Sequence, residues 1–241
     1  MARIIQQPAY VLHGRPYRET SLLLEVLSRD HGRAAMVARG ARGPKSRLRH
    51  VLQPFRPLLI SWSGRGELGT LSGAEQVAAP PSLQGESLYC GLYINELLTR
   101  LLHRGDPHPE TFERYTTVLG GLAAEQDVQP LLRCFERDLL EDVGYGLMLD
   151  HEFGAQRQID PSASYEYRPG QGPVRLAAAV SGQKRLISGA ALIALSTGEI
   201  EGAHLTELRR LMRRVIRYHV GDKPLASQAL FLGLRKKDKG P

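Results

Sequence analysis

The sequence contains very little that could build a covalent framework or a metal site. Only two of its 241 residues are cysteines, Cys90 and Cys134, and both fall within stretches of helical periodicity. Two such cysteines do not make the disulfide framework of a secreted domain, so we expect buried thiols in a reducing compartment. None of the eight histidines stands at a spacing that suggests metal ligation. We therefore expect no metal and no cofactor.

Long apolar runs and catalytic motifs are also missing. No run approaches the ~18 apolar residues that span a bilayer, and the N-terminus lacks the apolar core of a secretory signal. We therefore expect a cytoplasmic protein without membrane contact. The chain has no P-loop, GxSxG, HExxH or CxxC motif. Neighbouring carboxylates such as Glu141 and Asp142 point apart on a helix. These absences favour a binding protein over an enzyme.

Positive charge is abundant and unevenly distributed. The formal net charge is +7 for the whole chain, and it is +7 for residues 1–80, −8 for residues 81–160 and +8 for residues 161–241. Alternating charge blocks indicate separate modules with separate partners. The two basic blocks favour a polyanion.

The most basic stretch covers residues 29–55, where seven cations face one anion, Asp30. Gly40, Gly43 and Pro44 punctuate this stretch and predict a loop or hairpin tip. Such a tip can follow a phosphate backbone. A solvated basic loop without a specific role fits the composition equally well.

The first eighty residues predict a small closed β-barrel. Short strands bounded by glycine turns suit a five-stranded OB-type barrel, with an SH3-like barrel as the rival. Two prolines at 80–81 end this module. The predicted strands are Ala9–His13, Ser21–Leu27, Arg33–Ala38, Pro57–Ser63 and Glu67–Ala74.

The rest of the chain predicts an α-helical domain with a small loop-and-strand insert, which makes the whole an α+β multidomain protein. Amphipathic periodicity predicts three packed helices between residues 81 and 149. Residues 150–180 are rich in glycine and proline and predict a loop-rich β insert with strands at 165–168 and 174–179. Residues 181–234 predict C-terminal helices at 188–196, 203–220 and 227–234, and residues 235–241 a disordered basic tail.

Two further groups of residues are candidates for binding. The helix predicted at 203–220 carries a basic stripe opposite its apolar face, which is either a second anion surface or a solvated face paired with the acidic block. Near the barrel cations, Tyr17 between Arg15 and Arg18 could stack on a base, whereas Phe55 and Trp62 are expected to fill the core. The stripe consists of Arg209, Arg210, Arg213, Arg214 and Arg217.

The motifs VLHGRPYRETSLLLEVLSRDHGR, MVARGARGPKSRL and LQPFRPLLISWSGRGELGTLSGAE resemble the bacterial RecO family of DNA repair and recombination mediators. The resemblance continues through LYCGLYINELLTRLL, LLRCFERDLLEDVGYG and GDKPLASQAL, so that it covers nearly the whole chain. It implies an OB barrel followed by a helical domain. It also implies ATP-independent strand annealing and, together with RecR, help in loading RecA onto strands coated with the single-strand binding protein SSB.

The resemblance also suggests site residues and partners. The family's basic segment maps to residues 38–46, and the resemblance suggests Arg39, Arg42 and Lys45 as phosphate contacts. It also suggests Arg133 as a contact for the acidic SSB C-terminal tail. Expected partners are single- and double-stranded DNA, the SSB tail and RecR. Many members carry a four-cysteine zinc module after the GYG motif, but no cysteine follows Gly146 here. The candidate DNA-binding set is Arg15, Tyr17, Arg33, Arg39, Arg42, Lys45, Arg47 and Arg49.

Two alternatives share this evidence. The helical domain could be the working surface of a protein-interaction adaptor that binds an acidic SSB-type tail, with DNA contact secondary. The barrel could also serve an RNA-binding OB-fold factor. Both alternatives use the same basic residues, and single strands and duplex could share one surface or use two.

Overall fold

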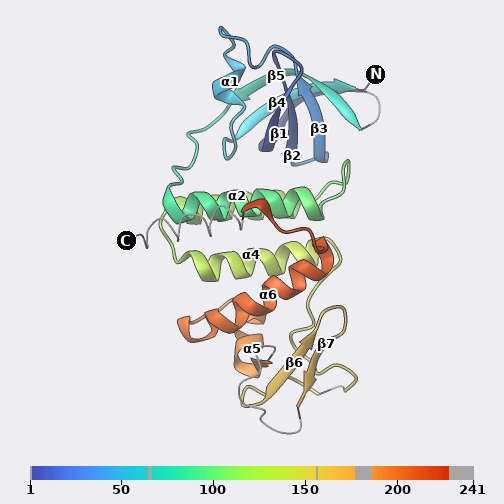
Figure 1. Cartoon of the computed structure of the whole chain (residues 1–241), viewed down its shortest axis with the longest axis vertical. Helices are drawn as coiled ribbons and strands as arrows, with labels where there is room; N and C mark the ends of the chain where they lie inside the picture. Colours follow the sequence, from blue (N-terminus) through green and yellow to red (C-terminus); the bar gives the residue numbers. More distant parts are fainter. Residues whose placement is uncertain (1, 65–66, 156, 177–185, 228–241) are drawn as a thin grey trace. The chain divides into compact units, whose positions relative to one another are not determined.

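A computed structural model describes residues 2–64, 67–155, 157–176 and 186–227 (Figure 1). By its internal contacts the chain divides into two compact units. We call Met1–Glu125 together with the segment from Pro224 onward the barrel unit, and Gln126–Lys223 the helical unit. The predicted helix at 227–234 and the predicted disordered tail lie outside the described residues, apart from Ser227.

Five strands close into a barrel at the start of the barrel unit. Their order around the barrel is β1-β2-β3-β5-β4, β1 pairs with β4 to close it, and β3 runs parallel to β5. This confirms the predicted five-stranded barrel followed by a helical region with a small sheet. The strands are β1 (Ala2–Tyr17), β2 (Ser21–Ser28), β3 (Gly32–Ala38), β4 (Leu58–Gly64) and β5 (Leu68–Gln76).

Strand β1 is 16 residues long, whereas the sequence predicted a strand of only five residues. It is long because its first half pairs with β4 and its second half with β2. Register shifts between Ile4 and Gln7 and between Val11 and His13 interrupt its alternation. Such irregularities bend a strand and hide the two-residue period from a sequence pattern.

The barrel interior is filled by apolar side chains from all five strands. Leu24, Met36 and Ile60 are almost fully buried there, and Trp62 joins them. Phe55 is buried as well, and its ring lies close to Gly91 of the following helix. The prediction that Phe55 and Trp62 serve packing is therefore confirmed.

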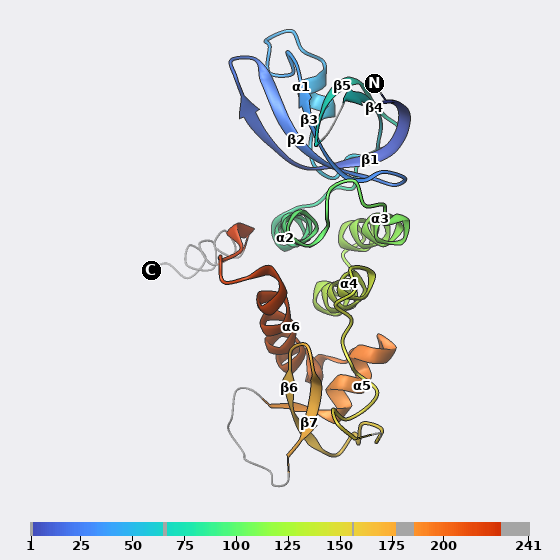
Figure 2. The ribbon, with the colours of Figure 1, turned by 90° about the vertical axis from the view of Figure 1, so that its right-hand side faces the viewer.

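Two helices, α2 (Gly85–Leu101) and α3 (Pro109–Ala123), complete the barrel unit (Figure 2). Tyr10 of β1 packs its ring against the rings of Phe112 and Tyr115 at 5.4 and 5.0 Å. The buried Asn95 amide donates to the Leu12 carbonyl at 2.9 Å and accepts from the Tyr115 hydroxyl at 2.7 Å. Because both polar atoms of this buried amide are hydrogen-bonded, the amide stabilises the docking of α2 on β1.

The chain returns to the barrel unit at Pro224. The Glu96 carboxylate of α2 accepts from the backbone N–H groups of Ala226 and Ser227, both at 2.9 Å, and from the Ser227 hydroxyl at 2.7 Å. Burial works to raise the pKa of Glu96, but these hydrogen bonds hold it below its ordinary value.

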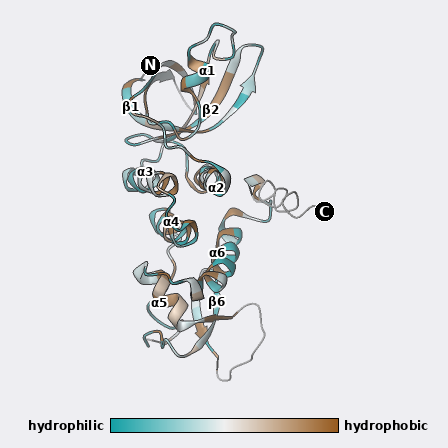
Figure 3. Ribbon diagram, turned by 90° about the vertical axis from the view of Figure 1, so that its left-hand side faces the viewer, coloured by the Kyte–Doolittle hydropathy of each residue, from teal (hydrophilic) through white to brown (hydrophobic). Residues whose placement is uncertain are grey.

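The helical unit combines helices with a three-stranded antiparallel sheet of order β7-β6-β8. Strand β6 confirms the strand predicted at 165–168, and β8 was not predicted. The apolar faces of the helices form its core, and Figure 3 shows hydrophilic and hydrophobic residues alternating around α6. The elements are α4 (Val128–Asp142), β6 (Ser164–Arg168), β7 (Gly172–Arg175), β8 (Leu186–Ser188), α5 (Gly189–Thr197), the 3-10 turn η1 (Gly202–His204) and α6 (Leu205–Val220).

A polar network occupies the region of the insert. The buried Tyr165 hydroxyl donates to Glu152 at 3.1 Å, and Arg175 bridges Glu152 at 3.3 Å and Asp160 at 2.9 Å. In the part of the chain that the structure describes, no three His, Cys, Asp or Glu side chains gather at one point. The insert contains no cysteine, so its residues do not fit a four-thiolate zinc module. Among the described helices, none has the length and hydropathy to cross a membrane.

Candidate nucleic-acid interface

The basic segment after β3 folds into tight turns and one short helix. Gly40 has a φ of +67°, which glycine adopts without strain. The N–H of Gly43 donates to the Gly40 carbonyl and the N–H of Ser46 to the Gly43 carbonyl, both at 3.0 Å. Helix α1 (Leu48–Val51) follows, where the sequence had predicted only a loop. A one-turn helix is too short to produce a periodic signal.

Apolar anchors hold this segment against the barrel. Ala41 is completely buried in the barrel core, and Leu52 is buried beside it. Leu48 and Val51 pack on the same core. Because the apolar side chains face inward, the cations between them face outward. Exposed are Arg39, Arg42, Lys45, Arg47 and Arg49.

The turn between β1 and β2 lies next to this segment. The N–H of Arg42 donates to the Thr20 carbonyl at 2.7 Å, and its guanidinium reaches the Arg18 carbonyl at 3.4 Å. Arg18 in turn lies over the Tyr17 ring, 5.4 Å from its centre. The exposed Arg15 is on the same strand end. Residues 22 and 24 positions apart in the sequence thus join in one surface.

We call this surface the basic end of the barrel. It lies around α1, on the side of the barrel away from α2 (Figures 1 and 2). Tyr17 is half-buried, so it offers less free ring than the sequence suggested. The cations of the basic end are Arg15, Arg18, Arg39, Arg42, Lys45, Arg47 and Arg49.

The cations of the basic end are uncompensated. Within the described part of the chain none of them forms an ion pair, and the β1–β2 turn contributes a single carboxylate, Glu19. Like charges crowded on one surface repel one another, and a polyanion relieves that repulsion. The exposed positive charge of the basic end therefore favours binding of a phosphate backbone without sequence readout.

Arg33, a candidate from the sequence, does not belong to the basic end. It lies near the other end of β3, where its guanidinium donates to the Thr99 carbonyl of α2 and lies 3.9 Å from Glu25. Arg104 pairs with the same Glu25 carboxylate. Burial lowers the pKa of the Arg33 guanidinium, while Glu25 works to raise it. This environment gives Arg33 a structural role between the barrel and α2.

The arginines of the predicted stripe lie on the polar face of α6, as the periodicity indicated. Arg210, Arg213 and Arg217 are exposed, whereas Arg209 and Arg214 are half-buried. Arg217 pairs with Asp222 at 2.8 Å, and Arg214 donates to the Tyr167 carbonyl at 3.1 Å. This α6 basic face is therefore partly compensated by its own unit.

Arg133 occupies a buried position on α4. Only 7% of its side chain is exposed, and its guanidinium pairs with the buried Glu136 carboxylate at 2.9 Å. A buried pair of this kind is costly to break, because one charge would be left without its partner. Within the described residues, the Nε of Arg133 is buried without a hydrogen-bond partner, so a peptide carboxylate could bind there only if it gained access to this buried position.

Sequence reasoning missed Arg18 as a member of the basic end, although its position beside Tyr17 was a signal. It also missed Tyr145 and Tyr218, two exposed tyrosines of the helical unit. Tyr218 follows Arg217 on α6 at the border between the apolar and polar faces, and its ring is largely exposed.

The fold and this surface define a class: a closed five-stranded barrel with a cationic end, followed by a helical region that carries a small sheet. Residues 1–80 match the family model "Recombination protein O N terminal" and residues 82–229 match "Recombination protein O C terminal". The chain therefore belongs to the RecO family of DNA repair and recombination proteins, as its motifs predicted.

Individual relatives agree over nearly the full length. The chain is 47% identical to the DNA repair protein RecO of Nitrosococcus oceani over 236 residues, which are 97% of this chain and 95% of the relative. It is 46% identical to that of Aromatoleum aromaticum, covering 97% and 98%. It is 43% identical to that of Dechloromonas aromatica, covering 98% of both chains.

Proposed function

We propose that this chain is a non-enzymatic mediator of DNA repair and homologous recombination. It binds single- and double-stranded DNA, anneals complementary strands, and helps load a recombinase onto SSB-coated DNA. The observation that carries the proposal is the basic end of the barrel, where seven uncompensated cations are held outward by buried anchors. Membership of the RecO family supports the same role.

Annealing needs no bond chemistry on this account. Two strands repel each other through their phosphates, and cations that neutralise phosphates on both strands lower that repulsion. Contacts to the backbone carry no sequence information, so the bases stay free to find their complements. No nucleotide hydrolysis is required for either step.

The partners of this function are the acidic C-terminal tail of SSB and RecR. The proposed tail contact at Arg133 requires the packing around this buried side chain to open. An Arg133→Ala variant would then lose the tail but anneal bare strands as the parent does. Equal annealing defects on bare and SSB-coated strands would remove Arg133 from the tail site.

The test is annealing of complementary oligonucleotides in nucleotide-free buffer, with bare and with SSB-coated strands. The parent chain should accelerate annealing in both cases. The triple variant Arg39→Ala, Arg42→Ala, Lys45→Ala should lose most of the acceleration. A matched triple, Arg3→Ala, Arg29→Ala, Arg114→Ala, removes three charges outside the basic end and should keep it. If the parent gave no acceleration, or required a nucleotide, the proposal would be wrong.

A further inference from the structure

The helical unit exposes a cluster of aromatic side chains that its packing does not require. The Tyr145 and His219 rings are stacked, with centroids 4.3 Å apart and planes inclined by 17°. The Tyr218 ring meets His219 edge-on at 5.0 Å. Tyr145 is 43% exposed and Tyr218 is 63% exposed. We call these three residues the aromatic cluster. Aromatic side chains with exposed faces are enriched at binding surfaces.

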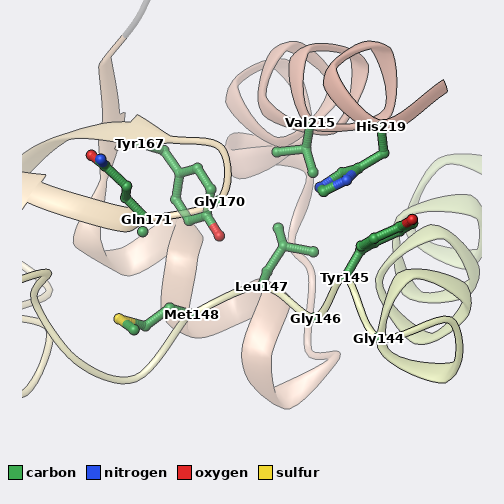
Figure 4. A pocket seen from close by; sticks show the side chains of 11 residues that line it. Gly144, Tyr145, Gly146, Leu147, Met148, Tyr167, Gly170, Gln171, Val215 and His219 are labelled. Atoms are coloured by element: carbon green, nitrogen blue, oxygen red, sulfur yellow. The ribbon is translucent and has the colours of Figure 1, made fainter. Parts of the chain in front are cut away.

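Two hollows adjoin the cluster, and both border the turn between β6 and β7. The first, of about 240 Å³, is seen in Figure 4, where Tyr145 and His219 stand side by side on one flank of it. The second, of about 340 Å³, is lined by Pro169, Arg214, Arg217, Tyr218, Gly221 and Asp222. The first is lined by residues 144–148, Tyr167, residues 170–172, Val215 and His219.

Two glycines in the turn between β6 and β7 leave space beside Met148 and Tyr218. A Cβ atom at Gly172 would stand 3.1 Å from Met148, and one at Gly170 would stand 3.4 Å from the Tyr218 hydroxyl. Both glycines also have positive φ, at +120° and +78°. The turn therefore keeps the hollows open where a larger residue would crowd them.

A cation lies beside Tyr218. Arg217 lines the same hollow as Tyr218, and the exposed Arg213 lies one turn before Arg217 on α6. Among the residues that the structure describes, the Arg217 side chain is held by the surface pair with Asp222, and the two side chains are 68% and 91% exposed. An exposed pair contributes little stability, so Arg217 can exchange Asp222 for a phosphate.

The charges around the cluster also decide where a strand can run. Glu141 of α4 lies against Gly146, so a phosphate on the α4 side would meet a carboxylate. The α6 side offers arginines instead. Burial lowers the pKa of His219, so at neutral pH the ring is uncharged and serves as a stacking partner.

We propose that the aromatic cluster, with Arg213 and Arg217, is a second contact for single-stranded nucleic acid. An unpaired base stacks on Tyr145 or Tyr218, and the neighbouring phosphates lie over the α6 arginines. Aromatic rings beside a cationic groove are the usual means of holding bases without sequence preference. The inference rests on the proposed function, because a chain that anneals strands gains from holding unpaired bases at more than one place.

Photo-cross-linking tests the contact directly. The full chain is bound to an oligothymidylate in which 5-iododeoxyuridine replaces some thymidines, irradiated, and mapped by mass spectrometry. Cross-links should appear on peptides that contain Tyr145 or Tyr218. Cross-links confined to residues 15–55 would overturn this inference and leave the proposed function standing. If the chain retained no oligonucleotide at low salt, both would be overturned.

Variants at Tyr218 supply a second readout. Loss of one stacked base should weaken oligothymidylate binding by roughly fivefold or more in Tyr218→Ala, and Tyr218→Phe should bind within about twofold of the parent. The urea midpoint should stay unchanged in both variants, since the side chain is mostly exposed. Parent-like affinity in Tyr218→Ala would contradict the inference. The inference would also be contradicted if a short acidic peptide with an apolar end bound the aromatic cluster and the oligonucleotide gave no cross-link there.

Discussion

The barrel unit and the helical unit each carry a basic surface, and the two are built differently. At the basic end, cations stand on loops, and in the described residues none of the seven has a carboxylate partner. On the α6 basic face, arginines stand on a regular helix, where Arg217 pairs with Asp222 and Arg214 holds the Tyr167 carbonyl. The helical unit in turn has the exposed rings of Tyr145 and Tyr218, whereas Tyr17 at the basic end is half-buried.

The difference indicates how the two surfaces divide the work of binding. Uncompensated cations release counterions when they meet phosphates, so the basic end should supply the salt-dependent part of the affinity. Stacking on exposed rings depends much less on salt, so the helical unit should supply contacts to unpaired bases. A positive charge count alone would have ranked the two surfaces as equals.

The Arg33→Ala variant sharpens the comparison most, because it removes a compensated cation from the barrel itself. Loss of the hydrogen bond to Thr99 and of the pairing with Glu25 should lower the free energy of unfolding by about 1–3 kcal/mol. Affinity for single strands at full folding should stay within about twofold. Urea unfolding and fluorescence anisotropy measure the two quantities.

Arg39→Ala is the matched control, since it removes one exposed cation just after the opposite end of β3. It should leave the free energy of unfolding within about 0.5 kcal/mol and weaken binding. If Arg33→Ala weakened binding more than Arg39→Ala without loss of stability, the assignment of Arg33 to structure would be wrong.

Removing the exposed arginines of α6 should have a smaller effect. In the variant Arg210→Ala, Arg213→Ala, Arg217→Ala we expect roughly 3- to 10-fold weaker binding of single strands, because part of this charge is already neutralised within the unit. Anisotropy titrations at two salt concentrations measure it. A loss as large as that of the basic-end triple would erase the distinction between the surfaces.

The smallest expected effect is a pH dependence at His219. Burial holds the folded-state pKa of this imidazole below its ordinary value of 6.5. The unfolded chain therefore takes up the proton first as the pH falls, so the stability contributed above pH 6.5 declines below it. The urea midpoint should drop slightly more for the parent than for His219→Gln between pH 7.5 and pH 5.5. Identical drops would show that the ring is not shielded.

Much of the fold could be predicted because local patterns and packing agree. Apolar residues recur with a period of two in the strands of the barrel and with a period of 3.6 in α2 to α6, and glycine and proline turns separate these segments. The exceptions have local causes. The length of β1 is hidden by its register shifts, and α1 and β8 are too short to show a period.

The sequence predicts what kind of ligand the site binds, but it does not predict which residues come together to form the site. The cluster of cations after β3 identifies a phosphate-binding loop, but strand pairing decides which cations meet. Arg42 donates to the carbonyls of Thr20 and Arg18, and Arg33 is carried to the α2 side by the same strand that delivers Arg39. The i,i+3 spacing of Arg133 and Glu136 permits an ion pair, but the sequence does not show that packing buries both side chains.

We expect the cations of the basic end to bind phosphates electrostatically, without making or breaking covalent bonds. The most direct measurement is the salt dependence of single-strand affinity for the parent and for Arg39→Ala, Arg42→Ala, Lys45→Ala. Removing three phosphate contacts should lower the magnitude of the slope of log K against log salt by about 2 and weaken binding by roughly 10- to 100-fold. An unchanged slope in a correctly folded triple variant would contradict the account.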